Sequence, residues 1–247
     1  MDDVSTPQFV HYLPIGTTLI SAVFVVSLLM RYAQRRTGPH LLWWAGGMFC
    51  YGMGTFVESW ITLGGNSITL TKSWYILGAI LGGYPLAQGS VYLHYSRAKA
   101  HILSAITVPI ILATSILVLL SPVYPELLDP VRPSGAILQW QWVRALTPII
   151  NIYAAVFLIG TAAMSSYSFA RQRGSRNRAI GNAWIAIGAV LPGIGGTMAK
   201  AGYVEGLYIG EFVGVILIWI GYRFCIRPDL AVACEKVEGI SSQYSSS

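Results

Sequence analysis

Long apolar stretches separated by short polar segments run along almost the whole chain. Seven of them approach or exceed the roughly 20 residues that a helix needs to cross a bilayer. They lie at residues 10–30, 41–63, 74–95, 102–120, 138–169, 179–198 and 204–226. Because the bilayer core offers no water to the backbone, each stretch must form its own hydrogen bonds as a helix. The pattern predicts an all-α integral membrane protein, a seven-transmembrane-helix bundle.

The composition agrees with a single membrane domain. Charged residues make up 11% of the 247, whereas soluble domains contain about 25%. We assign residues 1–227 to one transmembrane domain and residues 228–247 to a short cytoplasmic tail that we expect to be partly disordered, because its end at 239–247 is polar and rich in serine. Asp2 and Asp3 stand where a signal peptide carries basic residues, so we expect the first span to be retained.

Lysine and arginine residues are distributed unevenly between the two sides of the predicted bundle. Many follow the first, third, fifth and seventh spans, which places the N terminus outside and the C terminus in the cytoplasm. The net charge of +6 therefore arises from loop residues that orient the spans, and we expect no nucleic-acid partner. We expect the protein to lie in a bacterial or archaeal cytoplasmic membrane. The inner set is Arg31, Arg35, Arg36, Arg97, Lys99, Arg171, Arg173, Arg176, Arg178, Arg223, Arg227 and Lys236, and the outer set is Lys72, Arg132 and Lys200.

Ionisable residues within the spans mark the candidate site, because charges are costly in a membrane. Glu58, Arg144 and Glu211 all fall in the outer third of the predicted bilayer. Since a guanidinium can hold two carboxylates, we expect a ligand-binding or structural cluster in which Arg144 pairs with Glu58, Glu211 or both. Asn151 should lie two turns deeper than Arg144, and the alternative for Arg144 is snorkelling to the headgroups. The predicted outer rim consists of Lys72, Trp140, Trp142, Lys200 and Tyr208.

Glycines at four-residue intervals predict close contacts between helices. Gly206, Gly210 and Gly214 follow one another in the seventh span, and Gly78 and Gly82 lie in the third. Small residues at this spacing let helix backbones approach each other in lipid. We interpret these faces as packing within the bundle, and self-association into a homo-oligomer stays open as the alternative.

The chain shows no recognisable catalytic or metal-binding motif. Its three cysteines have no metal-ligand spacing, and no HExxH, GxSxG or Walker sequence occurs. His11 is expected outside and His40, His94 and His101 inside, so no facing histidine pair is available and haem is not expected. We assign neither catalytic residues nor metal ligands, and we leave the cofactor unassigned.

The seven spans and the outside N terminus resemble the microbial rhodopsins in topology. That family carries a retinal Schiff-base lysine in the middle of its seventh span. Here the seventh span contains the segment GLYIGEFVGVILIWIGYRF, which has no lysine, and Lys200 precedes it. Covalent retinal is therefore not expected. The layout is also similar, again in topology, to the seven-span sensory modules that precede bacterial histidine kinases.

Three functions fit these features. The first is a non-catalytic module that binds a small or lipophilic ligand near the outer leaflet, as a sensor or an accessory module. The second is a structural subunit of a larger membrane complex, with pigments or quinones among the candidate cargoes and a membrane-protein partner. The third is an intramembrane enzyme that uses Glu58 or Glu211 as a general acid or base. Transport ranks last, because no internal repeat is evident.

Overall fold

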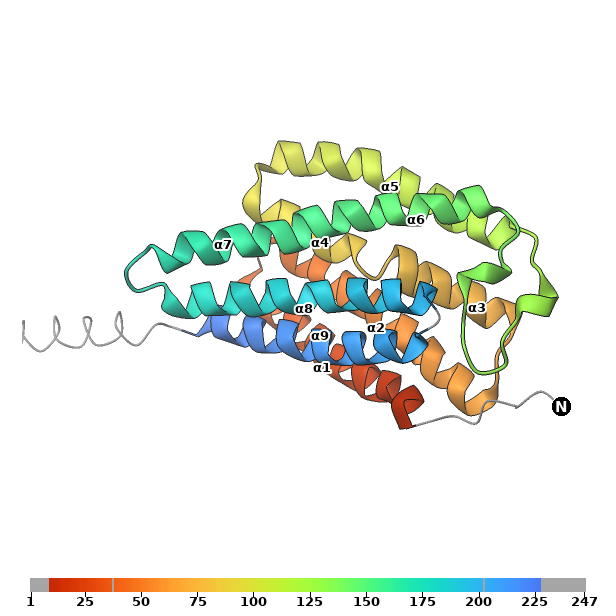
Figure 1. The fold of residues 1–247 in the computed structure, drawn as a ribbon. Coiled ribbons are helices and arrows are strands. Elements are labelled where there is room, and N and C mark those ends of the chain that lie inside the picture. Colours follow the sequence, from red (N-terminus) through yellow and green to blue (C-terminus); the bar gives the residue numbers. More distant parts are fainter. Residues whose placement is uncertain (1–8, 37, 202, 228–247) are drawn as a thin grey trace, which may run out of the picture.

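The computed structural model describes residues 9–36, 38–201 and 203–227, without the side chains of Lys200 and Val204. Within these residues the regular structure is helical, with one isolated antiparallel bridge between Val123 and Leu138 (Figure 1). The predicted tail at 228–247, with Lys236, lies outside the described residues. The fold is a bundle of long helices.

The first two long helices form a hairpin. A short turn of 3-10 helix, η1 (Phe9–Tyr12), leads into α1 (Leu13–Arg35), and α2 follows at Pro39–Gly64. The proline at the start of α2 suits a first helical turn, where a backbone N–H would have no acceptor within the helix. The helix ends at Gly65, whose φ of 84° is readily adopted by glycine. α2 lies against α1, α3 and α4, so it runs through the middle of the bundle.

The third predicted span consists of several pieces. It comprises α3 (Ile68–Trp74), the π-helical segment η2 (Tyr75–Ile80) and α4 (Tyr84–His94). The helix begins at Ile68 and not at Trp74 as predicted, because the Ser67 side chain caps it by accepting a hydrogen bond from the Leu70 backbone N–H at 3.2 Å. Hydropathy missed this turn, since it contains threonines and Lys72. A turn at residues 81–83 separates η2 from α4, just before Pro85.

The remaining helices complete the bundle. The chain continues through α5 (Arg97–Leu120), two 3-10 turns, η3 (Pro125–Leu127) and η4 (Gly135–Ile137), and α6 (Gln141–Ala154). A second π-helical segment, η5, joins α6 to α7, and a long hairpin ends the described chain. These last elements are η5 (Ala155–Gly160), α7 (Thr161–Ala170), α8 (Arg176–Lys200) and α9 (Val204–Ile226).

Six helical segments of the described chain are long and apolar enough to cross a membrane. They correspond to the first predicted span and to the third through the seventh. α2 is not among them although it has 26 residues, because glycine, tryptophan and polar residues lower its hydropathy. Many of its residues are buried within the bundle, so α2 needs less apolar surface than a lipid-facing helix. The structure therefore supports a multi-pass helical membrane protein with six apolar spans.

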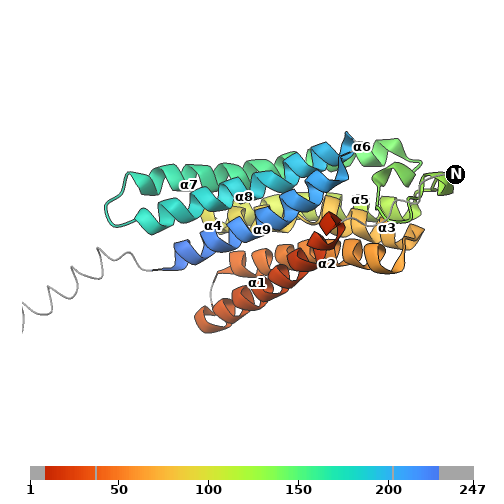
Figure 2. The ribbon, with the colours of Figure 1, turned by 60° about the horizontal axis from the view of Figure 1, so that its bottom comes forward.

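α8 and α9 pack backbone to backbone along their length (Figure 2). A Cβ added at Gly188 would lie 2.7 Å from the Gly214 carbonyl oxygen, and one at Gly210 would lie 2.7 Å from the Leu191 carbonyl oxygen. A Cβ at Gly206 would press on the Met198 side chain at 2.8 Å. The glycines of the seventh predicted span thus face α8 within the same chain.

The two glycines of the third span have different surroundings. A Cβ at Gly54 of α2 would lie 3.0 Å from the Gly78 Cα, so α2 and η2 are in close contact there. A Cβ at Gly82 would instead collide with the Gly78 carbonyl oxygen of its own segment. Gly82 is therefore required by the local π-helical break, whereas we had expected it to contribute to packing between helices.

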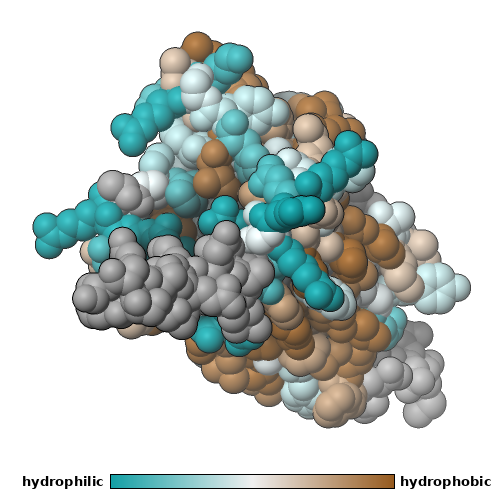
Figure 3. All heavy atoms as spheres, turned by 90° about the vertical axis from the view of Figure 1, so that its left-hand side faces the viewer, coloured by the Kyte–Doolittle hydropathy of each residue, from teal (hydrophilic) through white to brown (hydrophobic). Residues whose placement is uncertain are grey.

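Basic residues gather at one end of the bundle. This end contains the C-terminal ends of α1 and α9, the start of α5 and the connection between α7 and α8. Figure 3 views it directly and shows long hydrophilic side chains standing around an apolar body. The other end contains the segment between α5 and α6 and the described start of the chain.

Candidate functional site

A buried glutamate of α2 lies beside a half-buried glutamate of α9. Glu58 of α2 is 1% exposed, and its carboxyl group interacts electrostatically with that of Glu211 on α9. The indole N–H of Trp74 donates to Glu58 Oε1 at 2.5 Å. The Oε2 atoms of both glutamates are buried and have no hydrogen-bond partner within the described residues. Glu58 and Glu211 are the centre of the candidate site, which we call the carboxyl pair.

Helix spacing and close packing bring the partners of this pair together. Tyr51 precedes Glu58 by two helical turns on α2 and donates its hydroxyl hydrogen to the Glu211 backbone carbonyl at 3.0 Å, which ties α2 to α9. The contact between Gly54 and Gly78 holds the third span against α2. Trp74, one turn before Gly78, is thereby placed beside Glu58.

Tyr208 lies beside the carboxyl pair on α9. It is 1% exposed, its hydroxyl interacts electrostatically with both Glu58 and Glu211, and this oxygen has no hydrogen-bond partner among the described residues. The ring of His11, from η1, meets the Tyr208 ring edge-on with a centroid distance of 5.8 Å. Burial of a hydroxyl without a hydrogen-bond partner lowers the stability of the fold, so packing alone does not explain the position of Tyr208.

The segment between α5 and α6 lies close to this site. Asp129 and Arg132 both interact electrostatically with the Tyr208 hydroxyl. Asn66 holds the segment by donating to the Asp129 and Arg132 carbonyl oxygens at 2.7 and 3.3 Å. Arg132 forms an ion pair with Glu205 at the start of α9, at 3.4 Å. These contacts hold the segment between α5 and α6 in an ordered conformation.

Two residues predicted for the cluster lie elsewhere. The Arg144 guanidinium donates to Gln141 Oε1 at 2.8 Å and interacts with the Tyr75 hydroxyl, so the predicted pairing of Arg144 with Glu58 or Glu211 is wrong. Asn151 is exposed on the surface of α6. Residues predicted to lie at equal depth on different helices need not face each other.

The predicted rim is likewise divided. Tyr208 belongs to the site itself, whereas Lys72 donates to the Leu119 and Ser121 carbonyl oxygens at 2.8 Å each and caps the end of α5. Trp140 and Trp142 stack on each other at the start of α6 with a centroid distance of 6.0 Å. The side chain of Lys200 lies outside the described part of the chain.

Sequence reasoning missed His11, Tyr51 and Trp74. Tyr51 carried a usable signal, because its spacing of two turns places it on the same helix face as Glu58. Trp74 carried none, since it meets Glu58 only through the packing of two helices. His11 was assigned only to a side of the membrane; it is 1% exposed and packed against Tyr208.

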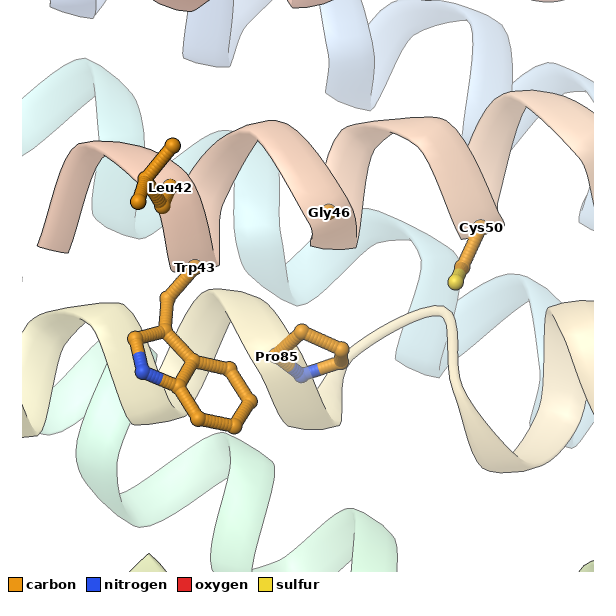
Figure 4. Close-up of a pocket in the computed structure, with 5 residues that line it drawn as sticks. All are labelled: Leu42, Trp43, Gly46, Cys50 and Pro85. Atoms are coloured by element: carbon orange, nitrogen blue, oxygen red, sulfur yellow. The ribbon is translucent and has the colours of Figure 1, made fainter. Parts of the chain in front are cut away.

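A separate apolar groove lies between α2 and α4 (Figure 4). It encloses about 330 Å³ and is lined by Leu42, Trp43, Gly46, Cys50 and Pro85. Cys50 precedes Glu58 by about 12 Å along α2, so the groove occupies the part of the bundle nearer the basic end. Its lining offers little hydrogen bonding, and it suits a hydrocarbon chain or a flat apolar ring.

Replacing Trp74 with phenylalanine should destabilise the protein. The indole N–H is the hydrogen-bond donor to Glu58 Oε1, and a hydrogen bond to a charged group contributes about 1.5–3 kcal/mol. We expect Trp74→Phe to lower the free energy of unfolding in detergent by about 1.5–3 kcal/mol. Trp142→Phe, at a site 56% exposed, is the matched control and should change little. Equal losses in the two variants would contradict the assignment.

Comparison with protein families, curated proteins and solved structures finds no match to this chain. The geometry of the carboxyl pair therefore carries the functional argument.

Proposed function

We propose that this chain is a non-catalytic membrane protein that binds a small ligand at the carboxyl pair, as a sensor or an accessory module. The observation that carries this proposal is the set of buried oxygen atoms at Glu58, Glu211 and Tyr208 that the described residues leave without other donors. Acceptors of this kind favour a ligand with hydrogen-bond donors and a positive charge, such as a primary ammonium group.

The proposal includes seven crossings and an N terminus outside. With 26 residues, α2 is about 39 Å long, which is sufficient to cross a bilayer of about 30 Å. Its place between α1 and the third span supports a crossing in the opposite direction to α1. The basic residues at one end of the bundle favour a cytoplasmic location for that end. The carboxyl pair then lies in the outer half of the membrane.

Native mass spectrometry of the protein, extracted in mild detergent from its own membranes, tests this function. We expect a stoichiometric small-molecule adduct on the wild type and its loss in Glu58→Gln, because the amide removes the negative charge. Glu126→Gln makes the same chemical change at an exposed position in η3 and should retain the adduct. A bare wild-type protein, or an adduct that survives in Glu58→Gln, would overturn the proposal.

The groove supports a second candidate, a subunit that holds a lipophilic molecule within a larger complex. The observation in its favour is the apolar lining between Trp43 and Pro85. The same mass spectra separate the two functions, since a groove-bound lipid or quinone should survive Glu58→Gln and be lost when Gly46 is replaced with phenylalanine.

A further inference from the structure

Glu58 and Glu211 bring two acidic groups together where the described residues do little to stabilise two negative charges, because the Oε2 atom of each is buried and has no hydrogen-bond partner there. An ionised carboxylate only accepts hydrogen bonds, so neighbouring carboxyl groups can bond to each other only if one of them carries a proton. Two adjacent negative charges would also repel strongly in surroundings of low dielectric constant. Burial of these oxygen atoms without other donors therefore favours one proton held between the two carboxyl groups.

We propose that the carboxyl pair is a proton-binding site in which Glu211 carries the proton and donates it to the Glu58 carboxylate. This inference rests on the proposed function. It adds that a proton occupies the same site when no other ligand is bound. The role of Glu58 as acceptor follows from Trp74, whose indole N–H already donates to Glu58 Oε1. A carboxylate with two donors is stabilised, whereas Glu211 receives no comparable side-chain donor in the described part of the structure.

The side chains around the carboxyl pair supply no lysine or arginine partner in the described part of the chain, which favours a bound proton. His11 of η1 and Tyr208 of α9 lie at the site. Tyr51 of α2 also lies there, and its hydroxyl donates to the Glu211 backbone carbonyl. The cations nearby are engaged elsewhere, because Arg132 pairs with Glu205 and Lys72 binds carbonyl oxygens at the end of α5. Among the described side chains, no lysine or arginine forms an ion pair with the carboxyl groups. The remaining charged group near the site, Asp129, accepts hydrogen bonds from backbone N–H groups of its own segment.

Tyr208 connects the pair to the segment between α5 and α6. Its hydroxyl interacts electrostatically with both carboxyl groups and with Asp129 and Arg132. We assign the end of the bundle that holds this segment to the outside, so we expect the pair to respond to the external pH.

Infrared spectroscopy of the ligand-free protein in detergent tests the inference directly. A protonated carboxylic acid has a carbonyl stretching band above the amide bands, and deuterium oxide shifts it. We expect this band in the wild type at neutral pH and its loss in Glu211→Gln, whose amide N–H replaces the donated hydrogen bond. Glu126→Gln, at its exposed position, should leave the band unchanged.

Absence of the band from the wild type at neutral pH would overturn the inference. So would a band that persists in Glu211→Gln. These outcomes are independent of the mass spectra described above: a protein that shows the band but never carries an adduct contradicts the proposed function and supports the proton site. An adduct without the band contradicts only the proton site.

Discussion

The folded protein should lose stability as the pH rises from about 5 upward, and Glu211→Gln should abolish much of this loss. Above about pH 4.3, glutamates exposed in the unfolded chain give up their protons. The folded protein keeps one proton between Glu58 and Glu211, so it binds more protons than the unfolded chain. Stability then falls with rising pH, by up to about 1.4 kcal/mol per pH unit for one proton, until the folded protein also releases it.

The amide of Glu211→Gln donates the same hydrogen bond at every pH, so the stability of this variant should depend little on pH. The measurement is the apparent unfolding temperature in detergent across this pH range for the wild type, Glu211→Gln and Glu126→Gln. We expect the Glu126→Gln curve to follow that of the wild type, because Glu126 is exposed in the folded protein as well. Parallel curves for all three proteins would show that no proton is held between the glutamates.

The helical architecture was largely evident in the sequence because lipid imposes a simple requirement. Every backbone group in the bilayer must be paired within its own helix, so an apolar stretch of sufficient length is a strong signal. The signal weakened where a helix faces protein and not lipid. α2 is the clearest example: Thr55, Glu58 and Ser59 are buried among neighbouring helices, so the helix does not need a uniformly apolar sequence.

The candidate site could be predicted only in part. Glu58 and Glu211 stood out because a charged residue within an apolar stretch needs a physical reason, and the structure brings their carboxyl groups together. Arg144 was assigned to them because it has similar depth, but the sequence does not encode which helices are neighbours or how each is rotated. The guanidinium is turned toward Gln141 and Tyr75.

The same limit applies to the breaks in the helices. The structure places a turn immediately before Pro85 in the third span. Pro192 also lies within an apolar span, yet α8 continues through it without interruption. The π-helical segment η5 begins at Ala155 and has no proline within it. Proline identity alone therefore does not determine where a membrane helix breaks, because neighbouring side chains can satisfy the freed carbonyl group.

Replacing Gly188 with leucine should disrupt the hairpin of α8 and α9. A Cβ at this position would lie 2.7 Å from the Gly214 carbonyl oxygen and 2.9 Å from the Ile218 backbone nitrogen, and neither backbone atom can move aside as a side chain can. Overpacking of a core typically costs about 1–3 kcal/mol, and we expect the upper part of that range or failure to assemble.

Gly193→Leu provides a control in the same helix. A Cβ at Gly193 would meet nothing within 4 Å, so the added side chain should extend into lipid with little effect on stability. Detergent-solubilised yield and apparent unfolding temperature measure both variants under identical conditions. Because Glu211 lies on α9 between Gly210 and Gly214, displacement of this helix should also separate the carboxyl pair and remove the infrared band of any Gly188→Leu protein that still folds. A Gly188→Leu protein as stable as Gly193→Leu would mean that α8 and α9 are not held together by this contact.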